Sequence, residues 1–269
     1  ADFISHTQVW LTNGSLKGFT LIWPTGDEAR RQRLLDEMLA SFTSIDGVMN
    51  ASAGTAEQSI DLVSGLEIRR PRLARSGFFL DQSGHIVTTS EAVQSCARIT
   101  IENAFEADVI ADDLMSGIAI LKPKEALSPT GFAILSSADP RLQTEIAVAG
   151  FSYEGVLGAP TLTFGVLSDV KGLDGEPELK RLALTALAGD AGGPVFDDTG
   201  AVLGMLLPEA TGARQLPEDV SFAIDADTIS KVAQSVGLST NQTGRTNRIA
   251  PEDLTDEAQE LTVLIGCWD

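Results

Sequence analysis

The chain has 269 residues, of which 43% are apolar and 21% are charged. This composition is typical of a globular protein with a buried core and excludes disorder of the whole chain. Acidic residues outnumber basic residues 38 to 19, which gives a net charge of −19. Because such a field repels phosphates and anionic lipids, nucleic acid is not an expected partner. Membrane insertion is not expected either, since no apolar run approaches the roughly 18 residues of a spanning helix.

The first residues predict a small β-β-α unit. Two strand-like runs, 9–11 and 19–23, flank Asn13-Gly14, the dipeptide favoured in two-residue hairpin turns. After the strand-breaking Pro24, apolar residues at helical spacing predict a helix that begins near Asp27. We expect residues 1–46 to form this extension and residues 47–60, which are small and polar, to form a linker. The extension either supports its neighbour or docks a partner.

The stretch 61–237 predicts an all-β sandwich or barrel, because it holds many short β-type runs separated by turn residues. These runs lie at 77–80, 86–89, 98–101, 118–121, 146–149, 161–167, 195–196, 202–207 and 220–224. A helix at 226–236 closes the region.

A tail at 238–269 is expected to pack on this domain. It reads as a polar loop at 239–248, a helix that begins at Pro251, and a strand at 261–265.

The sequence contains no pattern for a metal or a cofactor. The two cysteines, Cys96 and Cys267, are too far apart for a zinc motif or a Cys-x-x-Cys motif. They form either two buried thiols or one disulfide. We expect no metal site, no phosphate-binding loop and no cofactor.

The run from Gly189 to Pro194, Gly-Asp-Ala-Gly-Gly-Pro, is the most informative stretch of the sequence. Glycines let such a turn present backbone N–H groups to a shared concavity. The run resembles the nucleophile loop of trypsin-like serine proteases. Three further segments resemble that family in its own order: 76–93, 109–122 and 221–224. The last of them, Ser-Phe-Ala-Ile, resembles the strand beside the specificity pocket in HtrA-type members. The resemblance covers about residues 65–237 and implies two packed six-stranded barrels with the site in the cleft between them.

The resemblance also places the three catalytic positions. The serine position is Ala191, the histidine position is Glu91 and the aspartate position is Gly117. A serine protease needs a hydroxyl nucleophile, an imidazole base and a carboxylate that orients the base. None of the three residues supplies its role, so the resemblance predicts a pseudoprotease. The two histidines, His6 and His85, lie outside the motif.

Other parts of the family's site have counterparts that do not depend on those side chains. The loop Gly189, Asp190, Ala191, Gly192 and Gly193 keeps the backbone N–H groups of an oxyanion hole. The specificity pocket corresponds to Thr185, Phe222 and Ala223, and the uncharged Thr185 predicts no preference for basic side chains.

The resemblance also suggests a compartment and a role. HtrA-type proteins are found mostly in bacterial envelopes, where disulfides persist. We therefore expect a periplasmic or secreted protein in which Cys96 and Cys267 are bonded. The predicted function is an inactive trypsin-like module that binds a protein or peptide, and the sequence does not give its oligomeric state. The alternatives are an active hydrolase with a non-standard site and a purely structural subunit of an assembly.

Overall fold

The computed structural model describes residues 3–12, 15–43, 58–60, 67–209, 217 and 219–269. The chain divides into two compact units, Ala1–Arg70 and Pro71–Asp269. Each unit is described by itself. Across the described residues, no helix is both long enough and apolar enough to cross a membrane.

The first unit contains the expected β-β-α arrangement. Strands β1 (Phe3–Thr12) and β2 (Ser15–Pro24) pair antiparallel, with Thr12 opposite Ser15. The predicted turn residues Asn13 and Gly14 lie outside the described residues. Helix α1 (Glu28–Ser41) begins after Asp27, whose side chain accepts a hydrogen bond from the N–H of Arg30. An N-terminal cap of this kind satisfies a backbone donor that the helix itself leaves unpaired.

Most of the predicted linker at 47–60 lies outside the described residues. Its last three residues form β3 (Gln58–Ile60), which pairs antiparallel with β4 (Glu67–Arg69). The first unit therefore extends beyond the predicted extension and linker, and the strands of the second unit begin at Leu73.

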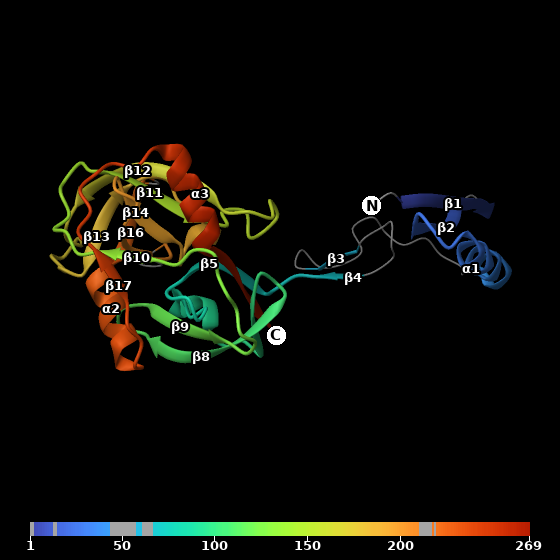
Figure 1. The fold of residues 1–269 in the computed structure, drawn as a ribbon, viewed down its shortest axis with the longest axis horizontal. Coiled ribbons are helices and arrows are strands. Elements are labelled where there is room, and N and C mark those ends of the chain that lie inside the picture. The colour runs from blue at the N-terminus through green and yellow to red at the C-terminus, as the bar shows by residue number, and fades with distance from the viewer. Residues whose placement is uncertain (1–2, 13–14, 44–57, 61–66, 210–216, 218) are drawn as a thin grey trace. The chain divides into compact units, whose positions relative to one another are not determined.

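The second unit contains two barrels, as the resemblance implies (Figure 1). The first is closed in the order β18-β5-β6-β9-β8-β7. Its strands are β5 (Leu73–Phe79), β6 (Ile86–Thr89), β7 (Arg98–Ile101), β8 (Phe105–Asp113), β9 (Ile118–Pro123) and β18 (Thr262–Trp268). The short helix η1 (Ser90–Val93) follows β6.

The second barrel closes because β14 pairs with both β11 and β15. Its strands are β11 (Glu145–Gly150), β12 (Thr161–Asp169), β13 (Leu179–Ala183), β14 (Pro194–Asp197), β15 (Val202–Leu206) and β16 (Val220–Asp225). Two short strands, β10 (Ile134–Ser136) and β17 (Asn241–Thr243), extend the sheet beyond β15. The strand β17 lies within the segment predicted to be a polar loop.

One apolar core joins the two barrels. Phe78 and Val87 of the first barrel belong to the same buried cluster as Phe196 and Met205 of the second. The helices α2 (Ala226–Ser235) and α3 (Pro251–Leu261) add residues such as Ile229 to this cluster. Because protein interiors are close-packed, this shared core fixes the loops of one barrel against those of the other.

The tail does more than pack on the barrel, because its last strand is part of the barrel. β18 pairs with β5 on one side and β7 on the other, so the first barrel does not close without it. The predicted boundary at residue 238 thus separates the barrel from one of its own strands. The disulfide expected between Cys96 and Cys267 is present, with the two Cα atoms 5.3 Å apart, and it ties β18 to the start of β7.

We expect the disulfide to contribute strongly to stability. It links residues 171 positions apart, and the chain-entropy argument gives about 4–5 kcal/mol at most for such a loop. The double variant Cys96→Ala/Cys267→Ala should therefore unfold at a much lower urea concentration than the wild type. Intact mass should rise by about two protons on reduction. Two alkylatable thiols in the folded, unreduced protein would contradict the bond.

Candidate active site

The structure brings together the three segments that carry the predicted catalytic positions. The N–H of Ser90, beside Glu91 in η1, donates to the carbonyl oxygen of Gly117 at 2.8 Å. On the other side, Gly192 lies against β5 and β6. A Cβ added there would come within 2.1 Å of the carbonyl oxygen of Ser76, and φ is +89°. Only glycine fits this contact, so Gly192 lets the glycine loop approach the first barrel.

Ser76 holds the glycine loop in place. This fully buried residue of β5 donates from its N–H to the carbonyl of Ala191 at 2.9 Å and from Oγ to the carbonyl of Gly189 at 2.8 Å. Its Oγ also accepts from the N–H of Phe151 at 2.8 Å. One side chain of the first barrel is thus bonded to two loops of the second. These bonds leave Ser76 without an accessible hydroxyl for chemistry.

Glu91, at the predicted histidine position, is held in an ion pair. Arg75 Nη2 lies 2.8 Å from Glu91 Oε1, and Nε lies 3.4 Å from Oε2. The side chain of Arg75 is 10% exposed, and its Nη1 also lies 3.9 Å from Glu154 Oε1. Sequence analysis did not identify Arg75 or Glu154. The available signal was a charged residue inside an otherwise apolar strand, 73–80.

Gly117, at the predicted aspartate position, contributes only backbone. Its φ is +73° and its N–H donates to the carbonyl of Asp113 at 2.9 Å. Within this turn the carboxylate of Asp113 accepts from Ser116 Oγ at 2.8 Å, and the carboxylate of the preceding Asp112 accepts from Ser90 Oγ. Gln94 donates to the same Oγ at 3.2 Å. Among the described residues, Ser90 Oγ is thus bonded to a carboxylate and a side-chain amide, and no bond to an imidazole is present.

The glycine loop contains a short 3-10 turn, η2 (Ala188–Asp190). The N–H of Ala191 donates back to the carbonyl of Ala188 at 3.4 Å. Ala191 belongs to the loop whose backbone N–H groups the sequence analysis assigned to an oxyanion hole. The N–H of Ala191 therefore already has a partner within the loop, and a ligand would have to compete with the carbonyl of Ala188 for this donor.

The buried side chain of Asp190 stabilises the glycine loop through hydrogen bonds. It is almost fully buried, and its carboxylate accepts from Ser152 Oγ at 2.6 Å and from the N–H of Leu187 at 2.9 Å. Removal from water raises the pKa of Asp190 above its ordinary value, and the two hydrogen bonds offset this only in part.

The predicted pocket residues lie on β16 and in the connection before the glycine loop. Thr185 is exposed, Phe222 is half-buried and Ala223 is fully buried. The carbonyl of Phe222 accepts from the N–H of Leu207 at 2.9 Å, at the cleft end of β15. Their role as a specificity pocket stays a prediction, as does the assignment of Glu91, Gly117 and Ala191 to catalytic positions.

The two histidines belong to different units of the chain. His85 Nδ1 lies 2.8 Å from Asp81 Oδ2, in the turn that connects β5 to β6. His6 belongs to β1 in the first unit. Within the described part of the chain, no three His, Cys, Asp or Glu residues are grouped so as to hold a metal ion.

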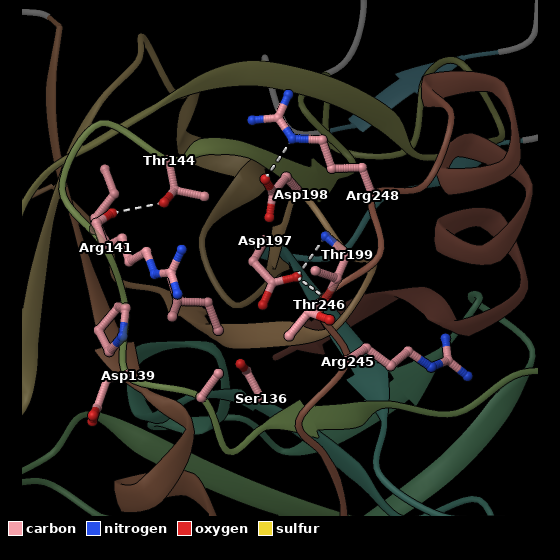
Figure 2. Close-up of a pocket in the computed structure, with 14 residues that line it drawn as sticks. Ser136, Asp139, Arg141, Thr144, Asp197, Asp198, Thr199, Arg245, Thr246 and Arg248 are labelled. Atoms are coloured by element: carbon pink, nitrogen blue, oxygen red, sulfur yellow. Dashed lines mark hydrogen bonds and ion pairs between the residues drawn. The ribbon is translucent and has the colours of Figure 1, made fainter.

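A cavity of about 650 Å³ opens at the opposite end of the second barrel (Figure 2). The strand β14 runs from the glycine loop to Asp197, which lines this cavity, so the cavity and the cleft lie at different ends of the strand. Arg248 pairs there with Asp198 at 3.0 Å. The charged residues that line the cavity are three arginines and three aspartates: Arg141, Arg245, Arg248, Asp139, Asp197 and Asp198. This balance favours neither an anionic nor a cationic ligand.

Comparison with known proteins agrees with the fold. Residues 75–205 match the family model of the trypsin-like peptidase domain. Over this stretch, which is 131 of its 269 residues, the chain is similar to trypsin-like peptidases. Its second unit resembles the solved Rv3671c protease of M. tuberculosis H37Rv in its inactive form, with a TM-score of 0.50 and 23% identity over 62% of this chain and 86% of that one.

Two curated relatives are named as proteases, one Do-like and one DegP-like, in agreement with the predicted HtrA-type resemblance. Protease Do-like 1 of Arabidopsis thaliana is 26% identical over 78% of this chain and 48% of its own length. A probable periplasmic DegP-like serine endoprotease of Rhizobium meliloti is 27% identical over 51% of this chain and 28% of its own. The chain thus spans less than half of either relative.

The buried carboxyl of Asp190 predicts a pH-dependent effect of Asp190→Asn. Because the pKa is raised in the folded state, the wild type gains stability when Asp190 is protonated. It loses this stability as the pH rises from the ordinary aspartate pKa of 3.8 through the raised value. The asparagine retains an acceptor for Leu187 and gains a donor for Ser152. Urea midpoints of the two proteins should therefore separate with rising pH, with the variant the more stable near neutrality.

A variant that is less stable by a constant amount at every pH would contradict this account. Asp219→Asn, at an exposed carboxylate, provides the control and should leave the pH profile unchanged.

Proposed function

We propose that this chain is a catalytically inactive trypsin-like protein whose cleft binds a protein or peptide segment. The proposal rests above all on Glu91, which occupies the predicted position of the general base as a carboxylate paired with Arg75. Both oxygens of this carboxylate are bonded to the guanidinium, and Glu91 has no imidazole that could take the proton of a nucleophile. Ala191 has no nucleophilic atom, and Gly117 has no side chain that could orient a base.

The fixed position of the glycine loop supports a binding role for the protein over a loss of all function. The bonds of Ser76 and the shared core hold the glycine loop against the first barrel. Such a preformed surface loses little conformational entropy when a ligand binds. A purely structural subunit would have no need of an accessible surface beside this loop.

An active hydrolase with a non-standard site is the second candidate, because the two curated relatives are named as proteases. Its nucleophile would have to come from a serine near the cleft. Ser90 is bonded to Asp112, and Ser76 is bonded to both neighbouring loops. Neither has an imidazole within the network, so this candidate has weaker support.

A periplasmic or secreted location is part of the proposal. The disulfide between Cys96 and Cys267 supports it, since disulfides persist mainly in oxidising compartments. The printed name of the R. meliloti relative also includes this compartment.

The experiment is turnover of a panel of fluorogenic peptides and esters by the wild type and by Ala191→Ser. We expect both proteins to match the buffer rate, because a serine without a base reacts little faster than water does. An active trypsin-like protease provides the positive control for the panel. Turnover by the wild type above buffer would overturn the inactive assignment, and turnover only by the variant would show that a base is present after all.

A further inference from the structure

An exposed apolar surface lies directly beside the glycine loop. Its four large side chains are Tyr153, Val156, Leu157 and Leu187, with exposed fractions of 55%, 70%, 59% and 43%. Together with Gly189 they line a hollow of about 460 Å³. We call these four residues the apolar shelf. Contiguous exposed apolar groups on a folded protein commonly mark an interaction site.

The residues of the apolar shelf lie in turns that hydrogen bonds stabilise. The N–H of Glu154 donates to the carbonyl of Phe151 at 2.8 Å, and the N–H of Val156 donates to the carbonyl of Tyr153 at 3.0 Å. Phe151 is buried against Leu264 of β18. On the other side, the N–H of Leu187 donates to the buried carboxylate of Asp190. The shelf is thus presented by both loops that Ser76 holds.

The rim of the shelf carries excess negative charge. Glu154 is part of the hollow, and it shares the guanidinium of Arg75 with Glu91. Two carboxylates, 58% and 41% exposed, thus face one largely buried cation. The net charge of the whole chain, these carboxylates included, is −19. This field attracts cationic groups and repels anionic ones.

We propose that the apolar shelf docks a peptide segment whose aliphatic or aromatic side chains are flanked by lysine or arginine. The apolar side chains cover the shelf, and the flanking cations face Glu154 and Glu91. A second copy of this chain is a poorer occupant, because a symmetric contact would bring the same acidic rims together. This inference rests on the proposed binding function and names the class of partner.

The test uses two pools of fluorescein-labelled decapeptides and fluorescence anisotropy. The six central positions of each peptide vary among Leu, Val, Phe and Tyr, and two lysines or two glutamates flank each end. We expect the lysine pool to bind at least about tenfold more tightly than the glutamate pool. Added salt should weaken this preference, since it screens exposed charges.

Two matched variants separate the shelf from other exposed leucines. Leu157→Ser removes one shelf residue and should weaken binding of the lysine pool about tenfold. Leu142→Ser, at a leucine that is 58% exposed in the connection before β11, should leave binding unchanged. Glu154→Gln should reduce the preference for lysine while keeping the affinity for apolar cores.

Three results would overturn the proposal. The first is equal binding of the two pools, or binding of neither. The second is a Leu157→Ser variant that binds as the wild type does. The third is a wild-type dimer, measured by light scattering, that Leu157→Ser dissociates, since the shelf would then be a self-association surface. None of these results restores catalysis, so turnover remains the separate test of the proposed function.

Discussion

The cleft depends on one buried hydrogen-bonding residue, Ser76. Its backbone and side chain are bonded to the glycine loop and to the start of the 151–158 connection, which both belong to the second barrel. Because an unpaired buried polar group costs free energy, the two loops and β5 favour a single arrangement. Gly192 makes this approach sterically possible. The position of the ion pair and the shelf follows from that arrangement, since Arg75 precedes Ser76 and Glu154 follows Phe151.

The ion pair decides what chemistry the cleft supports. A serine protease uses an imidazole as its base, whereas the predicted histidine position here carries a carboxylate that is bonded to a guanidinium. The Ala191 N–H, turned toward Ala188, adds a second departure from a catalytic arrangement. The surface beside the glycine loop has an apolar part and an acidic rim, and we propose that it recognises a peptide segment.

Sequence alone predicted much of this fold. Apolar runs such as 86–89 and 118–121 became β6 and β9, because strands buried on both faces read as continuous apolar stretches. The strand β8 was missed since most of its residues are polar or exposed. The β13 strand was missed because Lys180 is buried there beside Asp225, with 3.1 Å between Nζ and Oδ2. The role of β18 in closing the first barrel depends on a pairing across almost the whole unit, which local patterns do not encode.

In the site, too, sequence motifs predicted some residues, whereas others depend on tertiary contacts. The glycine motif and the order of the segments placed Glu91, Gly117 and Ala191 on loops that the structure joins through Ser90 and Ser76. Glu154 and the shelf residues have no sequence signature, because their importance comes from tertiary contacts between the barrels, and Arg75 was marked only by its charge within the strand β5. The disulfide was predicted from the resemblance, and the spacing of the cysteines alone did not decide it.

The central claim is that the cleft contains no activated nucleophile. The most direct measurement is intact mass of the wild-type protein after long incubation with a fluorophosphonate probe, which reacts with activated serines. The account predicts no adduct, while an active trypsin-like protease treated in parallel is fully labelled. A stoichiometric adduct on any serine of this chain would contradict it, and peptide mapping would then identify the nucleophile.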